Sequence, residues 1–235
     1  IVVPCYNEEE VLPETSKRLA QKLQSLIQAG QIAPDSRAMF VDDGSRDATW
    51  AQIASLCERS RLFSGVKLSR NKGHQNALLA GLMTAKEKAD MVISMDADLQ
   101  DDVDAVDRMV AEYYGGSDIV YGVRSSRKTD TCFKRTTAQG YYRFMKLLGV
   151  DVVYNHADYR LMSRRAIEGL AQFKEVNLFL RGIVPLIGYR SSVVEYERGE
   201  RFAGESKYPL KKMLSFAFDG ITSFSVRPIR LITLV

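Results

Sequence analysis

The sequence predicts an α/β fold built on a mostly parallel β-sheet, and two observations support this class. Short apolar runs alternate with longer amphipathic runs through the first half of the chain, as in repeated strand and helix units. The 235 residues, of which 46% are hydrophobic and 26% are charged, are enough to bury a full core. Disordered and fibrous classes are therefore excluded.

The expected elements follow in a regular order as far as residue 95. We expect strands at 2–4, 38–41, 65–68 and 91–95, with helices at 11–28, 49–60 and 75–85 between them. A strand at 118–121, a basic amphipathic helix at 133–148 and a strand at 191–196 are expected later in the chain. The polar segments 124–130 and 201–207 predict loops, and apolar residues recur at helical spacing from residue 210.

Charge and cysteine content narrow the classes of partner. A net charge of +4 falls well short of the dense basic fields of dedicated nucleic-acid binders, so we expect no nucleic-acid partner. Cys5, Cys57 and Cys132 are odd in number and widely spaced, so neither a disulfide framework nor a zinc site is predicted. A reducing, cytosolic setting is the one that these cysteines favour.

The segment Asp96-Ala97-Asp98 follows the apolar strand at 91–95 and is the sharpest chemical signal. Two carboxylates one residue apart can bind a hard divalent cation, Mg²⁺ or Mn²⁺, that also binds a diphosphate. Gln100 offers a further oxygen ligand. An Asp-x-Asp in an ordinary surface loop is the alternative, but the position at a strand end favours a metal.

The second expected strand ends in another acidic cluster, Asp42-Asp43-Gly44-Ser45. Its carboxylates can accept hydrogen bonds from a base N–H or a ribose hydroxyl. The alternative is a helix N-cap formed by Ser45 or Asp47. The carboxyl ends of parallel strands lie at one edge of a sheet, so the two acidic clusters are expected to face one crevice.

The first expected strand ends at Pro4, which is followed by Tyr6, Asn7 and Glu8. An aromatic ring there can stack on a base, and a carboxylate can hold polar edges. A helix-capping Asn followed by Glu residues has the same composition and is the alternative.

Asp158, in the run Asp158-Tyr159-Arg160, is a third acidic candidate. A carboxylate there can orient or deprotonate an acceptor nucleophile, whereas a buried ion pair between Asp158 and Arg160 is the structural alternative. His74 and His156 lack metal-ligand spacing, and both are expected to be structural or loop residues, with His74 near the donor.

Three basic residues, Arg124, Arg201 and Lys207, are candidate phosphate ligands, with a solvated surface role as the alternative. Two other phosphate-binding motifs are excluded. No G-x-G-x-x-G follows the first strand, which disfavours a nicotinamide-dependent dehydrogenase. The glycine spacing at 199–205 matches a P-loop, but Glu205 stands where that motif needs Lys.

Together these motifs resemble the family 2 glycosyltransferases, and in particular the polyprenyl-phosphate hexosyltransferases, namely the bactoprenol glucosyltransferases and the dolichol-phosphate mannose synthases. The segments that carry the resemblance are 3–8, 41–45, 96–100, 122–124, 158–160 and 201–207. The resemblance implies a Rossmann-like, GT-A type sheet. It also implies inverting, metal-dependent transfer of a hexose from a nucleotide sugar such as UDP-glucose to undecaprenyl phosphate, for cell-envelope glycosylation.

The resemblance assigns roles to matched positions. It implies a nucleoside pocket formed by Pro4, Tyr6, Glu8, Asp42 and Asp43. It implies a metal and diphosphate site formed by Asp96, Ala97, Asp98 and Gln100. The phosphate-binding basic groups would be Arg124, Arg201 and Lys207, and the catalytic set would be Asp158, Asp98 and Arg201.

The carboxyl-terminal segment predicts a membrane partner. We expect a catalytic domain at 1–208, followed at 209–235 by an amphipathic juxtamembrane segment and the start of a truncated transmembrane helix. The enzyme is thus expected at the cell membrane with its catalytic domain on the cytoplasmic side, and a homo-oligomer is possible. The alternatives are an ordinary helix packed on the domain, a family 2 enzyme with another acceptor, and a non-catalytic nucleotide-binding membrane scaffold.

Overall fold

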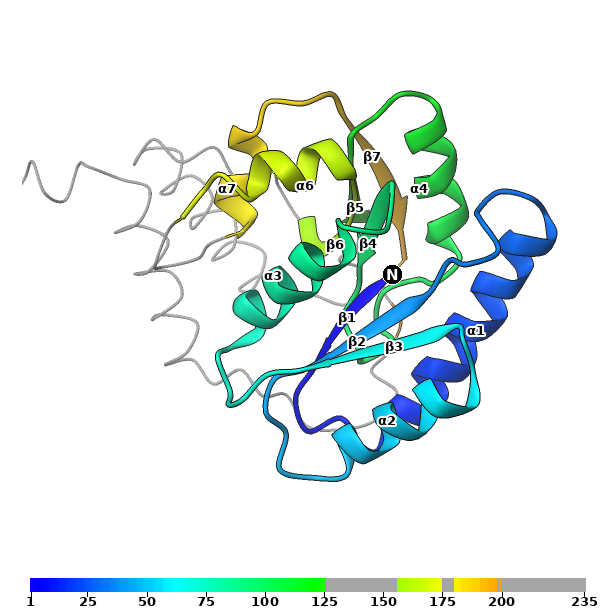
Figure 1. Ribbon diagram of the computed structural model, residues 1–235. Coiled ribbons are helices and arrows are strands. Elements are labelled where there is room, and N and C mark those ends of the chain that lie inside the picture. The colour runs from blue at the N-terminus through cyan, green and yellow to red at the C-terminus, as the bar shows by residue number, and fades with distance from the viewer. Residues whose placement is uncertain (126–155, 175–179, 198, 200–235) are drawn as a thin grey trace, which may run out of the picture.

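The computed structural model describes residues 1–125, 156–174, 180–197 and 199. Within them, seven strands form one sheet in the order β3-β2-β1-β4-β6-β5-β7 (Figure 1). The strands are β1 (Val2–Cys5), β2 (Ala38–Asp42), β3 (Phe63–Lys67), β4 (Met91–Ser94), β5 (Ile119–Arg124), β6 (His156–Ser163) and β7 (Ser191–Tyr196).

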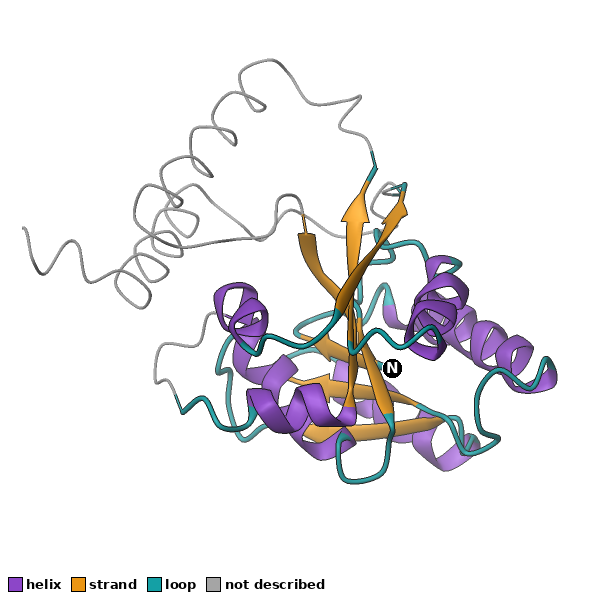
Figure 2. Cartoon of the chain, turned by 90° about the horizontal axis from the view of Figure 1, so that it is seen from above, coloured by secondary structure: helices purple, strands orange, loops and turns teal. Residues whose placement is uncertain are grey.

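Helices cover both faces of this sheet, as the view along it shows (Figure 2). The helices α1 (Leu12–Gln28), α2 (Thr49–Arg59) and α4 (Ala105–Tyr114) pack on one face. The helices α3 (His74–Ala85), α6 (Arg164–Leu170) and α7 (Leu180–Leu186) pack on the other. The described residues therefore form a three-layer α/β arrangement with an apolar core on each side of the sheet.

Helix α1 illustrates how sequence spacing sets this packing. Leu12, Leu19, Leu23 and Leu26 recur on one side of the helix, and all four are buried against the sheet. Pro13 lies in the first turn, where a missing backbone N–H costs no helical hydrogen bond. Burying each leucine contributes roughly 1.5–3 kcal/mol before the entropy cost of ordering it.

The parallel strands bring their carboxyl ends to one edge of the sheet. β1 pairs in parallel with both β2 and β4, and Cys5 lies opposite Asp42. β6 runs antiparallel to β4 and β5, so its amino-terminal end reaches the same edge, with Arg160 opposite Ser94. Asp158 is thereby placed beside the loop that follows β4.

The prediction of a mostly parallel sheet is confirmed, and the expected strands and helices in the first hundred residues are present. The strand expected at 65–68 lies at Phe63–Lys67 instead, because it pairs residue by residue with β2. The elements β6, α4, α6 and α7 were not predicted.

Several predicted features fall outside the described residues. These are the helix at 133–148, most of the loop at 124–130, the loop at 201–207, the helix from 210 and the domain boundary at 208. In the part of the chain that the structure describes, no helix has the length and hydrophobicity needed to cross a bilayer.

Candidate active site

The loop that follows β4 carries the predicted metal ligands. Its start is tied to α1, because Thr15 Oγ1 donates a 2.8 Å hydrogen bond to the Ala97 carbonyl. It then turns tightly: Asp98 Oδ1 accepts from the Gln100 amide at 3.1 Å, and Leu99 has a φ of 58°. The Asp96 side chain is 37% exposed, so a ligand can reach it.

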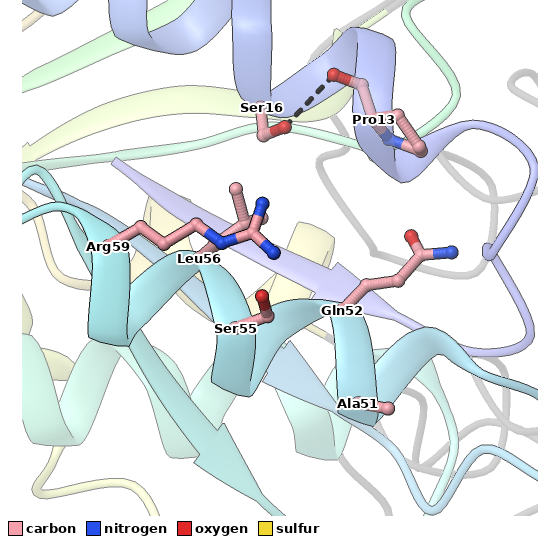
Figure 3. Close-up of a pocket in the computed structure, with 7 residues that line it drawn as sticks. All are labelled: Pro13, Ser16, Ala51, Gln52, Ser55, Leu56 and Arg59. Carbon is pink, nitrogen blue, oxygen red and sulfur yellow. Dashed lines mark hydrogen bonds between the residues drawn. The ribbon is translucent and has the colours of Figure 1, made fainter.

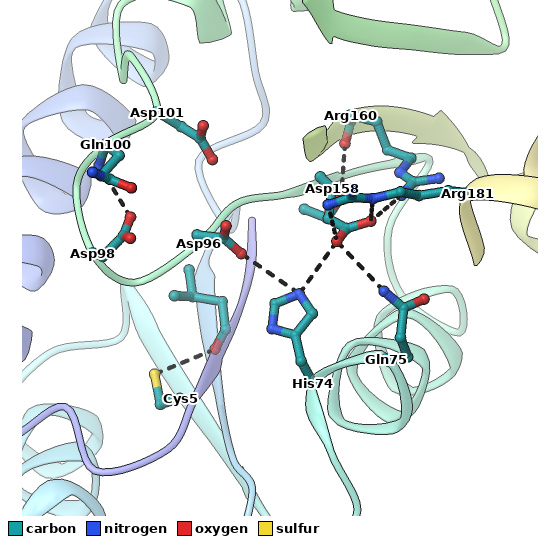
Figure 4. Close-up of polar contacts among 12 residues, drawn as sticks. Cys5, His74, Gln75, Asp96, Asp98, Gln100, Asp101, Asp158, Arg160 and Arg181 are labelled. Carbon is teal, nitrogen blue, oxygen red and sulfur yellow. Dashed lines mark hydrogen bonds and ion pairs between the residues drawn. The ribbon is translucent and has the colours of Figure 1, made fainter. Parts of the chain in front are cut away.

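His74, the first residue of α3, lies between two carboxylates at this edge of the sheet (Figure 4). Its Nε2 is 3.5 Å from Asp96 Oδ1 and 3.6 Å from Asp158 Oδ2. The expectation that His74 lies near the donor site fits this position, but its contact with both carboxylates was not predicted. The two acidic groups predicted for donor and acceptor therefore share one neighbour.

Asp158 is the centre of a buried polar cluster. Arg160 Nη2 contacts Asp158 Oδ1 at 2.6 Å, which is the buried ion pair that the structural alternative predicted. Arg181 in α7 adds a two-pronged contact, with Nη2 3.1 Å from Oδ2 and Nε 3.3 Å from Oδ1. Gln75 Nε2 donates to Oδ2 at 3.4 Å. Both oxygens of Asp158 are thus engaged.

These charges set the ionisation of the cluster. Burial works against protonated His74, but the Asp158 and Asp96 carboxylates outweigh it and raise the pKa of His74 to about 9. Burial also works against ionised Asp158, yet Arg181, His74 and Arg160 hold its pKa well below the ordinary value. Partial burial raises the pKa of Asp96, although its side chain still reaches solvent, and the Asp158 carboxylate acts in the same direction.

Asp43 holds the loop that leads into α3. Its Oδ1 accepts from the Lys72 amide at 2.7 Å and its Oδ2 accepts from the Gly73 amide at 2.9 Å. Asp42 is buried, and its Oδ1 accepts from the Ser45 amide at 3.1 Å. Both residues therefore shape the strand-end loops, and their contact with a nucleoside stays a prediction.

The residues after β1 are connected to the loop after β2. Asn7 Oδ1 accepts from the Arg46 amide at 2.9 Å, and Thr49 Oγ1 accepts from the Glu8 amide at 2.8 Å. Pro4 is buried in β1, whereas Tyr6 and Glu8 are half-buried. This places the predicted nucleoside residues at the carboxyl edge of the parallel strands.

Arg124 ends β5 beside a second buried carboxylate. Its Nε donates to the Tyr196 hydroxyl at 3.4 Å, and that hydroxyl donates to Asp101 Oδ1 at 2.5 Å. Burial and the negative charge of Asp96 raise the pKa of Asp101 to about 7. Asp101 and Tyr196 were not predicted as site residues. The position of Asp101 directly after Gln100 was a signal in the sequence that could have identified it.

A groove of about 390 Å³ lies elsewhere, between α1 and α2 (Figure 3). It contains none of the predicted site residues. Its lining consists of Pro13, Ser16, Ala51, Gln52, Ser55, Leu56 and Arg59.

The donor set after β4 is compatible with a divalent metal. Among the residues described, no group of three or more His, Cys, Asp and Glu side chains is arranged to hold an ion. Mg²⁺ is commonly bound by only one or two carboxylates together with waters and substrate phosphates. Asp96, Asp98 and Gln100 supply oxygen ligands of this kind, so they fit a metal that is shared with a diphosphate. Arg201 and Lys207 lie outside the described residues.

Comparison with known proteins decides the family. The model of the family described as Glycosyl transferase family 2 matches residues 1–170, which is more than half of the chain. The chain belongs to glycosyl transferase family 2. It is therefore an enzyme of the glycosyltransferase class, as the sequence motifs predicted.

Individual relatives agree with this membership. The chain is 60% identical to the uncharacterized glycosyltransferase YkoT of Bacillus subtilis, over 100% of this chain and 70% of that protein. It is 38% identical to the bactoprenol glucosyl transferase of Shigella phage SfV, over 100% of this chain and 74% of that protein.

The fold is shared with a solved structure. Glucosyl-3-phosphoglycerate synthase from Mycobacterium tuberculosis superposes with a TM-score of 0.54 at 16% identity, over 94% of this chain and 76% of that chain. This likeness confirms the Rossmann-like, GT-A type fold class that the resemblance implied.

Proposed function

We propose that this family 2 glycosyltransferase transfers a hexose from a nucleotide sugar, UDP-glucose first among the candidates, to a polyprenyl phosphate with inversion at the anomeric carbon. The observation that carries the proposal is the contact of His74 with both Asp96 and Asp158. The carboxylates that we propose for the donor side and the acceptor side therefore share His74 as a neighbour at one sheet edge. The similarity to a bactoprenol glucosyl transferase along the whole chain supports the lipid acceptor.

On the donor side, Asp96 and Asp98, with Gln100, would hold Mg²⁺ or Mn²⁺. The metal, when bound, neutralises negative charge that develops on the departing diphosphate. Glucosyl-3-phosphoglycerate synthase, which has a similar fold, was crystallised with Mn²⁺ and UDP-glucose, and this supports the proposed donor and ion. Tyr6, Glu8 and Asp43 are the proposed nucleoside residues, since they follow β1 and β2 at the same edge.

On the acceptor side, an oxygen of the lipid phosphate attacks the anomeric carbon. The new C–O bond forms as the bond to the nucleotide diphosphate breaks, and the electron pair leaves with the diphosphate. The basic residues Arg124, Arg201 and Lys207 are the proposed phosphate ligands, and of these Arg201 and Lys207 would hold the departing diphosphate together with the metal. Because the acceptor is a membrane lipid, we place the enzyme at the cytoplasmic face of the cell membrane, with 209–235 as the membrane-proximal segment.

A reconstitution assay tests the proposal. The full chain is incubated with undecaprenyl phosphate, Mg²⁺ or Mn²⁺ and a panel of nucleotide sugars, and the glycolipid is identified by mass spectrometry. We expect one lipid-linked hexose whose formation stops in EDTA and in the Asp96→Ala and Asp98→Ala variants. Asp104→Ala is the control, because Asp104 is 85% exposed and its carboxylate contacts Lys22.

Two results would contradict this function. Near-normal turnover in EDTA would remove the metal from the mechanism. Nucleotide binding without donor hydrolysis or lipid transfer would identify a non-catalytic scaffold instead.

A further inference from the structure

Asp158 was predicted as a carboxylate that orients or deprotonates the acceptor, but its surroundings suit a different task. A general base needs an oxygen lone pair directed at the proton it removes. Oδ1 of Asp158 contacts the guanidinium groups of Arg160 and Arg181, and Oδ2 contacts Arg181, Gln75 and His74. The carboxylate is 7% exposed, so these partners enclose it.

Arg181 is the most exposed of the charged side chains that contact Asp158. Its side chain is 37% exposed, compared with 29% for His74 and 2% for Arg160 on the inner side of Asp158. Figure 4 shows Arg181 beside Asp158, on the opposite side of His74 from the loop that carries Asp98 and Gln100. Arg181 also acts electrostatically on Asp96, so it lies within range of the donor-side carboxylates.

We propose that Arg181 binds the phosphate of the acceptor and that Asp158 is a positioning residue, which holds the Arg181 guanidinium in place. This inference rests on the proposed function, because it takes the acceptor to be a polyprenyl phosphate. A planar guanidinium carries five N–H donors in a fork that matches phosphate oxygens. It can therefore contact Asp158 along one edge and a phosphate along another.

A cation at the position of Arg181 would reduce the repulsion between an anionic acceptor and the acidic loop after β4. An anionic acceptor must come close to Asp96 and Asp98, and like charges at short range repel each other. Among the residues described, Arg181 is the partly exposed cationic side chain that contacts Asp158 from the side of α7. Asp158 fixes the Arg181 guanidinium at the sheet edge, where its positive charge offsets the repulsion.

The chemistry of the acceptor needs no base. A phosphate monoester has a second pKa near 6, so it is largely dianionic at neutral pH. Its oxygen supplies the electron pair for the new C–O bond, and the electron pair of the broken bond leaves with the nucleotide diphosphate. No proton has to be removed, which agrees with the contacts of Asp158, because both of its oxygens already accept hydrogen bonds from neighbouring side chains.

Steady-state kinetics with undecaprenyl phosphate and UDP-glucose test the inference. In Arg181→Gln we expect the acceptor KM to rise about 10- to 100-fold, the range for losing hydrogen bonds to a charged group. The donor KM should change much less than the acceptor KM, since the Arg181 guanidinium is proposed to hold the acceptor phosphate. Arg181→Lys should recover part of the acceptor affinity, because it keeps the charge but not the fork.

Arg164→Gln is the matched control. Arg164 is 43% exposed and contacts the carboxylate of Asp90 at 3.1 Å, the same distance as Arg181 from Asp158, but near the opposite end of β4. Its acceptor KM should equal that of the wild type. Thermal unfolding of every variant shows whether a kinetic change follows from a loss of folded protein.

Asp158→Asn separates the positioning role from a base. If Asp158 is a positioning residue, Asp158→Asn should raise the acceptor KM and leave the shape of the pH–rate profile unchanged. In the double variant with Arg181→Gln, it should raise the acceptor KM by less than about threefold beyond Arg181→Gln alone. A fall in kcat with an unchanged acceptor KM and a lost acidic limb would overturn the inference. So would an unchanged acceptor KM in Arg181→Gln, which does not depend on how Asp158→Asn folds.

The outcome also separates this inference from the proposed function. If the wild type does not glycosylate undecaprenyl phosphate but does glycosylate another phosphorylated acceptor, the proposal of a lipid acceptor fails. The same Arg181→Gln comparison with that acceptor then supports the inference if the KM rises, and contradicts it if the KM does not. An acceptor that carries no phosphate contradicts both.

Discussion

Replacing Tyr196 by Phe should destabilise the fold through one buried carboxylate. The Tyr196 hydroxyl donates to Asp101 Oδ1, and Asp101 is 3% exposed. Among the described residues, Asp101 Oδ2 has no hydrogen-bond partner, and Arg124 Nη2 is 3.9 Å from Oδ1. Without the hydroxyl, the carboxylate loses its short contact and remains buried.

Tyr159 provides a matched comparison for the size of this effect. It is as buried as Tyr196, the two rings pack edge to face at 5.2 Å, and its hydroxyl donates to the Asp102 carbonyl at 2.8 Å. Losing a hydrogen bond to a neutral carbonyl costs about 1 kcal/mol, whereas losing one to a charged group costs about 1.5–3 kcal/mol. We expect Tyr196→Phe to cost about 2–3 kcal/mol and Tyr159→Phe about 1 kcal/mol.

Urea unfolding at about pH 8.5, where Asp101 with its pKa of about 7 is ionised, measures both variants. The urea midpoint should fall further in Tyr196→Phe than in Tyr159→Phe. The m-values of both variants should equal that of the wild type, since neither change alters the surface exposed on unfolding. Adding Asp101→Asn should reduce the cost of Tyr196→Phe, because an amide tolerates burial better than a carboxylate. A Tyr196→Phe variant that is no less stable than Tyr159→Phe would refute the reasoning.

Two further predictions concern stability. Gly44 has a φ of +70°, and a Cβ there would lie 2.7 Å from the backbone at 70–71, so Gly44→Ala should cost roughly 2–4 kcal/mol in urea unfolding. Gly30→Ala, at a φ of +67° with nothing within 4 Å, should cost only about 1 kcal/mol, and equal costs would contradict the steric argument. Hydrogen bonds from Arg165 hold the pKa of Asp118 below its ordinary value of 3.8, so this pair stabilises the fold above that pH. The stabilisation is lost as the pH falls through the folded-state pKa of Asp118. In Arg165→Gln, the unfolding free energy should therefore decline less steeply between about pH 5 and pH 2 than in the wild type. An equally steep decline in the variant would show that the pair does not cause it.

The position of the proposed donor residues at one sheet edge could be predicted because they follow strands that are visible in the sequence. Tyr6, Asp43 and Asp96 lie just beyond the ends of β1, β2 and β4, and the parallel register brings those strand ends to one edge. The same rule applies to the loop after β3, which leads to His74. His74 was nevertheless judged by metal-ligand spacing, which says nothing about its place at the sheet edge.

Strand β6 was missed because charged side chains interrupt its apolar pattern. Tyr159 and Leu161 pack in the core on one face, and Met162 packs in the core on the other. Asp158, Arg160 and Ser163 occupy further buried positions, and polar residues at such positions do not fit the hydrophobic periodicity by which a strand is predicted. The ion pair between Asp158 and Arg160 makes the burial of these two charges tolerable, and it becomes visible only when the strand is in place.

The proposed acceptor side depends on contacts between distant segments, and this explains why the sequence motifs identified Asp158 but not Arg181. The Asp158 carboxylate meets a helix 83 residues earlier through Gln75 and a helix 23 residues later through Arg181. Gln75 Oε1 also accepts from the Leu180 amide at 3.0 Å, so it joins the two helices directly beside Arg181. Because β6 is antiparallel, it presents Asp158 at the edge where the parallel strands end, and the two helices converge on that one carboxylate. The reversed strand therefore sets the guanidinium groups of Arg160 and Arg181 beside the acidic loop of β4, which is the charge arrangement that the proposed nucleotide-sugar donor and phosphate acceptor would require.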